Sequence, residues 1–218
     1  MVLGVTVSVE VSSHSLFANR LCLDFANLPF ASGDRAEGAI FWDEFVDFLA
    51  VKRIISPEKT ASIRAMAKSD PCAAQNLLDH AERLGHALRL CFRAILRSQD
   101  LHREWVEPVN RILRVTEGHD ELQWDGTAWR LGFIAREEGL EWLLAAIARS
   151  GAELISEGAS QNLKQCANPD CQILFYDDSR THRRRWCSMA LCGNRSKVAA
   201  FARRNQQGEG EKASAHHA

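Results

Sequence analysis

Residues 166–192 read CANPDCQILFYDDSRTHRRRWCSMALC and contain four cysteines in two close pairs. Four residues separate the cysteines within each pair, and fifteen residues separate the pairs. A tetrahedral thiolate zinc site has this layout, because each pair supplies two ligands from one tight turn and the intervening chain folds back. The spacing therefore predicts one structural Zn²⁺ held by Cys166, Cys171, Cys187 and Cys192.

The first cysteine pair encloses Asn168-Pro169-Asp170, a combination typical of a tight turn. Such a turn brings its two flanking segments together as the arms of a hairpin. We therefore expect a zinc knuckle with Lys164–Cys166 and Ile173–Tyr176 as its arms.

The second cysteine pair cannot lie on one regular helix. Five residues advance about 500° around a helix axis, so Cys187 and Cys192 would point ~140° apart. Either Cys187 precedes the helix or the turn between the two cysteines is irregular, and Gly193 allows a close approach there. A helix over Asn194–Arg204 is expected to follow.

The alternative interpretation of the pattern is four reduced cysteines that fill a core. Closely paired thiols beside turn residues are not typical of core packing, and nothing else in the sequence indicates the redox chemistry of an iron–sulfur cluster. A site with four thiolates has no open coordination position, so it braces the fold and activates no water. We predict that the protein is not an enzyme.

The charge of the chain is concentrated around the cysteines. The whole chain carries −1, whereas residues 165–204 carry +5 and the remainder −6. A nucleic-acid footprint must therefore be local. Some cations offset the formal −2 of the zinc centre, Arg195 first among them, and a merely solvated basic face is the alternative. Trp186 is expected to pack inside the module. The predicted phosphate or base contacts are Arg183, Arg184, Arg185, Arg195, Lys197, Arg203 and Arg204.

The chain before the cysteines is predicted to be helical with one hairpin. Ser56-Pro57-Glu58 and Asp70-Pro71 are helix-start signals. Asp125-Gly126, between two short runs within Glu121–Phe133, is the strongest short signal for a hairpin. Two further elements are expected near the N-terminus, a strand over Val5–Val11 and a buried helix over Leu21–Asn27. One expected helix starts at Ala39, and another follows Pro71 and carries an apolar stripe from Leu77 to Ile95. The last two expected helices cover Trp105–Thr116 and Arg136–Ile155.

These elements predict a mainly α protein, with a helical domain over residues 1–158, a small zinc finger made of a knuckle and a helix over residues 159–204, and a disordered tail over residues 205–218. No stretch reaches the ~18 apolar residues of a membrane span, and no signal peptide is visible, which favours the cytoplasm.

The stretch Arg183–Arg204, with the preceding CANPDCQILFYDDSR, resembles the CGNR zinc-finger family. The namesake residues are Cys192-Gly193-Asn194-Arg195. LCLDFAN, residues 21–27, is similar to the opening motif of the helical ABATE domain that precedes such fingers, although Leu28 replaces an expected threonine. The resemblance implies a stress-induced bacterial transcription regulator.

We therefore expect a regulator that binds DNA through the basic zinc module, while the helical domain senses a small molecule or forms a homodimer. One alternative is a zinc-stapled module that binds RNA or protein. Another is an enzyme or a small-molecule binder housed in the helical domain, for which a pocket at Asp24 and Asn27 would be the sign. The loose titratable candidates there are Asp24, His14, His80, His86, His102 and Glu104.

Overall fold

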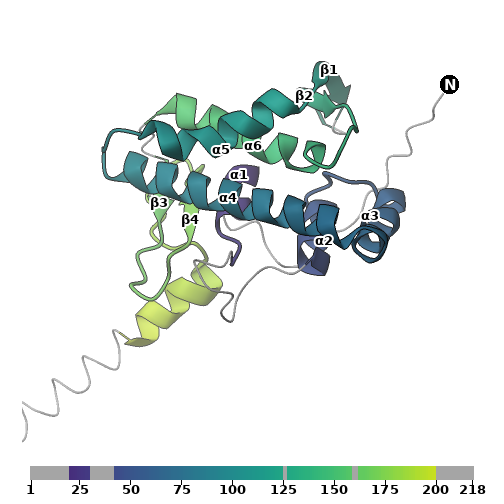
Figure 1. Cartoon of the computed structure of the whole chain (residues 1–218). Helices are drawn as coiled ribbons and strands as arrows, with labels where there is room; N and C mark the ends of the chain where they lie inside the picture. The colour runs from purple at the N-terminus through teal and green to yellow at the C-terminus, as the bar shows by residue number, and fades with distance from the viewer. Residues whose placement is uncertain (1–19, 30–41, 125–126, 159–161, 200–218) are drawn as a thin grey trace, which may run out of the picture.

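The computed structural model describes residues 20–29, 42–124, 127–158 and 162–199 (Figure 1). The predicted strand Val5–Val11, the Asp125-Gly126 turn, Arg203, Arg204 and the tail lie outside these residues. Within them the chain is mainly α, as predicted. The helices are α1 (Leu21–Ala26), α2 (Trp42–Val51), α3 (Pro57–Ser69), α4 (Pro71–Leu96), α5 (Arg103–Val115) and α6 (Trp142–Glu157).

Two of the helices begin at the predicted signals. The Ser56 hydroxyl accepts a hydrogen bond from the Lys59 N–H at the start of α3. The Asp70 carboxylate accepts one from the Ala73 N–H, at 2.9 Å, at the start of α4. In both helices proline is the first residue, where its missing N–H costs nothing.

The centre of the fold is the short helix α1, in which Cys22, Leu23, Phe25 and Ala26 are fully buried. It contacts α4 and α6, and α4 runs the length of the body beside it (Figure 1). Gly151 allows α6 to approach α4 closely, because a Cβ at this position would lie 2.4 Å from a methyl carbon of Leu88. The predicted buried helix over residues 21–27 is therefore confirmed, ending at Ala26.

The hairpin predicted from the Asp125-Gly126 signal consists of β1 (Gly118–Trp124) and β2 (Trp129–Ala135), which pair antiparallel. Two predicted helix starts were wrong. Helix α5 begins two residues before Trp105. Helix α6 begins at Trp142 and not at Arg136, because the chain first leaves the hairpin through a turn in which Gly139 has a φ of +67°.

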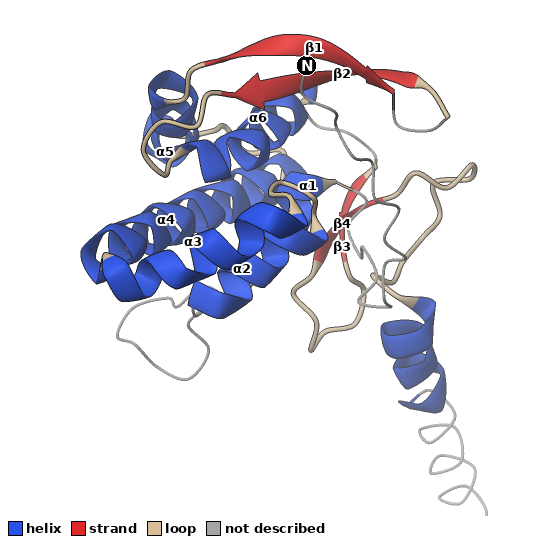
Figure 2. Cartoon of the chain, turned by 90° about the vertical axis from the view of Figure 1, so that its right-hand side faces the viewer, coloured by secondary structure: helices blue, strands red, loops and turns tan. Residues whose placement is uncertain are grey.

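The C-terminal module packs against the helical body through a second hairpin. Strands β3 (Leu163–Gln165) and β4 (Leu174–Tyr176) are antiparallel and contact α4 and α1 respectively. A helix over residues 194–199 then projects away from the body (Figure 2). In the described part of the chain, no helix is both long and apolar enough to cross a membrane.

Candidate metal centre and its basic surround

The first cysteine pair lies on the predicted knuckle. The Cys166 N–H donates to the Ile173 carbonyl at 2.9 Å, which continues the β3–β4 ladder into the turn. The Asn168 carbonyl then accepts from the Cys171 N–H at 2.9 Å, and its side-chain oxygen accepts from the Asp170 N–H. Asn168 thus closes the turn twice, which is the chemistry for which asparagine is favoured in turns.

The second pair shows both features that the spacing allowed. Cys187 precedes the helical segment, and Cys192 lies in a single π-helical turn, Met189–Gly193. The Ser188 hydroxyl caps this turn by accepting from the Leu191 N–H. A Cβ on Gly193 would lie 2.7 Å from the Met189 sulfur. The expected close approach at Gly193 is therefore confirmed, and the wider turn brings both cysteines to one side.

The four sulfur atoms form a compact cluster. All lie within 4.8 Å of one another, with Cys171 and Cys187 3.8 Å apart and Cys187 and Cys192 3.7 Å apart. Zinc–sulfur bonds of ~2.3 Å in a regular tetrahedron place the sulfurs ~3.8 Å apart. These separations fit one zinc ion and are much longer than a disulfide bond of ~2.05 Å.

The electrostatics of the cluster favour a bound cation. Burial, and then the neighbouring Cys192 and Cys166 sulfurs, raise the pKa of the Cys187 thiol far above its usual range. At Cys166 burial acts in the same direction, but backbone N–H donors, that of Cys187 at 3.4 Å first, outweigh it and lower the pKa. Four thiolates so close together repel one another unless a cation offsets their charge.

A zinc ion held by the four cysteines would supply cross-linking and nothing catalytic, because each coordination position is filled by sulfur. The observed hydrogen bonds to its ligands come from the Cys187 N–H and from the Asn168 amide, which points at the Cys192 sulfur from 3.6 Å. Arg195, the donor expected from the sequence, has an exposed side chain. The sequence did not predict that Asn168 contacts a zinc ligand, because its place in the turn was already a sufficient reason for asparagine there.

Asp177 is a second organising residue that the sequence did not reveal. Its carboxylate is fully buried and accepts from the Lys164 ammonium at 2.5 Å, from the Ser179 hydroxyl at 2.6 Å and from the Arg184 N–H at 2.9 Å. Burial alone would raise its pKa, but these hydrogen bonds outweigh burial and hold the pKa of Asp177 well below its usual range. Asp177 therefore ties the end of β4 to the arginine run.

Asp177→Asn is expected to lower the free energy of unfolding by about 2–4 kcal/mol at pH 7, because it removes the carboxylate that balances the charge of the Lys164 ammonium. The ionised Asp177 carboxylate makes its full contribution to stability above the unfolded-state pKa of ~3.9. This contribution is lost only as the pH falls below that value. The deficit should therefore stay constant from pH 6 to 8 in denaturant titrations of the zinc-loaded protein. The exposed neighbour provides the control: Asp178→Asn should change stability by less than about 0.5 kcal/mol. Equal effects of the two variants would refute the assignment.

The three consecutive arginines do not point the same way. Arg184 is half-buried, stacks on the Phe175 ring at 4.6 Å and donates to the carbonyls of Trp186 and Cys187. Its guanidinium therefore holds the chain next to a zinc ligand. Arg183 and Arg185 are exposed on either side of it.

The remaining predicted basic contacts are exposed where the structure describes them. Arg195 and Lys197 lie on the projecting helix, and their side chains are open to solvent. Trp186 is half-buried against the core, as expected, with the Arg185 guanidinium 5.3 Å from its ring. Arg203 and Arg204 lie outside the described residues.

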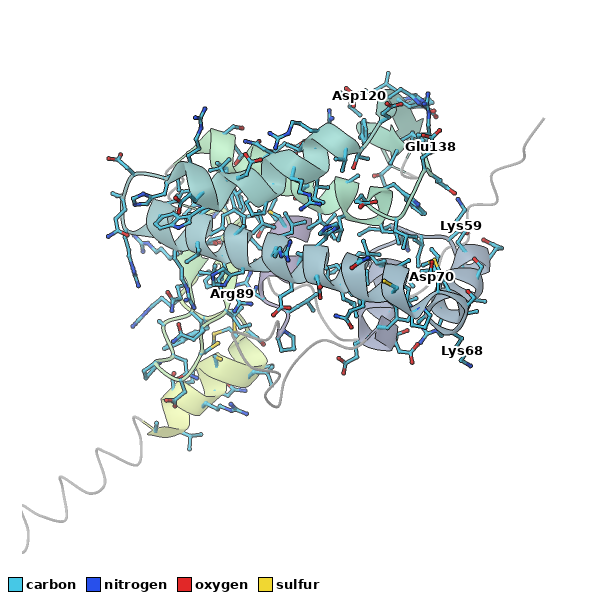
Figure 3. All side chains as sticks on the ribbon, viewed as in Figure 1. Lys59, Lys68, Asp70, Arg89, Asp120 and Glu138 are labelled. Atoms are coloured by element: carbon cyan, nitrogen blue, oxygen red, sulfur yellow. The ribbon has the colours of Figure 1, made fainter. Side chains whose placement is uncertain are left out.

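A junction between α1 and β4 joins the zinc module to the helical body. The Asn27 side chain donates to the Leu174 carbonyl at 2.7 Å and accepts from the Leu174 N–H at 2.9 Å. Arg89, which Figure 3 shows where α4 faces the module, donates to the carbonyls of Ala26 and Leu28 and so fixes the end of α1. Leu174 is fully buried in a core shared by the helices and the cysteines.

This junction accounts for the residues proposed as signs of a ligand pocket. Asn27 bonds β4, and Asp24 pairs with Lys52 at 2.7 Å. Two cavities among the described residues lie elsewhere, one at the base of the β1–β2 hairpin and one beside His80. His86, His102 and Glu104 are exposed, and His14 lies outside the described residues.

Comparisons with known families agree with this division of the chain. A family model described as "Putative stress-induced transcription regulator" (ABATE) matches residues 19–158, and the CGNR zinc-finger model matches residues 162–205. Neither description names an enzymatic activity. No curated protein sequence matches the chain. Since the ABATE match covers more than half of the 218 residues, the chain belongs to the ABATE family, and it carries a CGNR zinc finger with four cysteines placed to bind one metal ion.

Proposed function

We propose that the protein is a transcription regulator that binds duplex DNA through the exposed cations of its zinc module. The observation that carries the proposal is the orientation of the arginine run. Arg184 points inward and fixes the backbone beside a zinc ligand, so Arg183 and Arg185 are presented to solvent from a braced loop. Guanidinium groups on a rigid support suit bidentate contact with phosphate.

The projecting helix adds a second set of cations to this surface. It starts directly after the zinc-bound turn and extends away from the helical body (Figure 2), with Arg195 and Lys197 exposed on it. A short helix that stands clear of its own domain can approach a groove or backbone of a duplex without collision. The contacts proposed are Arg183, Arg185, Arg195 and Lys197, and Arg184 is assigned to the support.

Internal charge pairing strengthens the local positive field. Asp177 is neutralised by Lys164 and buried, so it does not offset the exposed arginines. The rest of the chain is acidic, which disfavours binding to DNA through any other face. The positive net charge is therefore concentrated in the zinc module.

The test is a salt series of duplex affinity. With about four phosphate contacts, the affinity should fall roughly 100-fold between 50 and 200 mM salt. Arg183→Gln/Arg185→Gln should weaken binding about 10- to 100-fold at low salt and lower the slope of log affinity against log salt by about 2. The measurement is fluorescence anisotropy with a labelled duplex.

Matched charge removal outside the zinc module provides the control. Arg97→Gln/Arg103→Gln removes two exposed arginines from the helical body and should leave affinity and slope unchanged. Absence of binding at 50 mM salt, or an equal loss in both double variants, would overturn the proposal. Single-stranded RNA that competes better than duplex DNA would favour an RNA-binding module instead, although half-buried Trp186 offers little surface for base stacking.

A further inference from the structure

We propose that the exposed face of the β1–β2 hairpin is an interface with a second copy of this chain. The strand register places Leu122 opposite Leu131 and Trp124 opposite Trp129. Residues two apart in a strand share a face, so these four side chains form one surface, here called the hairpin apolar face. All four are between 54% and 67% exposed.

The base of this same hairpin face is covered within the molecule. Asp120 and Phe133 are paired two residues closer to the base than Leu122 and Leu131. The Arg149 guanidinium of α6 lies 5.0 Å from the Phe133 ring centre and 2.9 Å from the Asp120 carboxylate. Toward the tip the hairpin extends beyond this support. The Trp124 and Trp129 rings contact each other at 5.7 Å, which stabilises the hairpin but leaves most of both indoles exposed.

The exposed area matches the requirement of a dimer. Two indoles and two leucines at these exposures present roughly 500 Å² of mainly apolar surface, which is at the upper end for a patch on a monomer. Two such faces packed together would remove about 1,000 Å² from water, the lower bound for a specific interface. A partner with a smaller apolar surface would leave part of the hairpin apolar face exposed to solvent.

The charges beside the hairpin apolar face disfavour an anionic partner. Glu117 pairs with Arg136 at 2.7 Å, and Asp120 pairs with Arg149. Arg136 also lies 3.7 Å from Glu138, and Arg149 lies 3.8 Å from Glu153, so the charged residues beside the face carry no excess of cations. A nucleic acid or an anionic membrane would instead require an excess of cations around the apolar face.

The face is also suited to two-fold symmetry. Each strand contributes one leucine and one tryptophan in matching order from base to tip. When two hairpins meet with opposite directions, the tryptophan pair of one copy lies over the leucine pair of the other, as an isologous interface requires. Asp120 and Glu138 mark this end of the molecule in Figure 3, far from the zinc module, so the interface leaves the basic surface free.

The test is the mass of the full-length, zinc-loaded protein by sedimentation velocity from 1 to 100 µM, a range in which a dimer of about this interface size is expected to form. The wild type should reach twice the 24.4 kDa of one chain. Leu122→Lys/Leu131→Glu replaces the apolar pair with an opposite-charge cross-strand pair, which preserves the hairpin. It should weaken association at least about 100-fold.

A second variant, Trp124→Thr/Trp129→Thr, keeps β-forming residues and should have the same effect, with unchanged circular dichroism showing that it folds. Val51→Glu and Val115→Glu alter valines of comparable exposure on α2 and α5 and should leave the dimer intact. A monomeric wild type at 100 µM, a dimer that survives both hairpin variants, or equal loss in the valine controls would overturn the proposal. A monomer whose indoles become exposed only after removal of residues 1–19 would assign the face to that segment.

Discussion

Cys187→Ser is expected to unfold the C-terminal module and to reduce zinc affinity by at least 100-fold. A structural zinc contributes roughly 10–16 kcal/mol to the folding of isolated zinc-finger peptides. Serine cannot provide a thiolate, and the three remaining sulfurs leave an open position. Part of the module's stability comes from its packing on α1 and α4, so we expect a net loss of at least about 4 kcal/mol, or roughly 10 °C in the unfolding midpoint.

The measurements are zinc content per chain, thermal unfolding and amide exchange over residues 163–199. Cys72→Ser is the matched control, because Cys72 is exposed at the start of α4, and it should retain one zinc per chain and the wild-type midpoint. Chelation of the wild type should reproduce the Cys187→Ser exchange pattern. A Cys187→Ser protein with full zinc content and unchanged exchange would show that the four cysteines are ordinary core residues.

Asn27→Ala is expected to lower the free energy of unfolding by about 2–4 kcal/mol, because two buried backbone groups lose their partners at once. In the wild type the Asn27 amide pairs with both the N–H and the carbonyl of Leu174. Alanine satisfies neither, and the fully buried position of Leu174 limits access of water. Denaturant titration of the zinc-loaded protein measures the loss.

A local readout separates this effect from general destabilisation. The Leu174 amide should exchange faster in Asn27→Ala even under conditions where α4 amides remain protected. Asn110→Ala, at an exposed position of α5, should change stability by less than about 0.5 kcal/mol. A stability change below about 1 kcal/mol with an equally protected Leu174 amide would contradict the role assigned to Asn27.

The zinc ligands could be predicted from the sequence because metal geometry constrains local spacing. The Asn168-Pro169-Asp170 turn and the 15-residue separation both operate over short stretches, and the structure brings the four sulfurs together as expected. Helix geometry alone also restricted the second pair to two alternatives, a Cys187 that precedes the helix or an irregular turn, and the structure shows both. Short-range chemistry therefore carried the prediction of the metal centre.

The junction and the support of the module could not be predicted in this way. Asn27 and Leu174 are 147 residues apart, and no local pattern links them. Asp177 and Asp178 are identical in type and adjacent, yet only Asp177 is buried. The same applies to Arg184 between two exposed arginines. In each case the direction of the side chain depends on long-range packing.

The Asn27–Leu174 junction couples the stability of the zinc module to that of the helical body. Cys166 directly follows β3, which pairs with β4, and the Asn27–Leu174 hydrogen bonds join β4 to the end of α1 at the centre of the helical body. By linkage, any ligand that shifts α1 must change zinc affinity by the same factor by which zinc changes the affinity for that ligand. Zinc affinity therefore depends on the state of the helical body. Zinc affinity measured with and without candidate effectors would detect coupling between effector binding and zinc binding, without any DNA present.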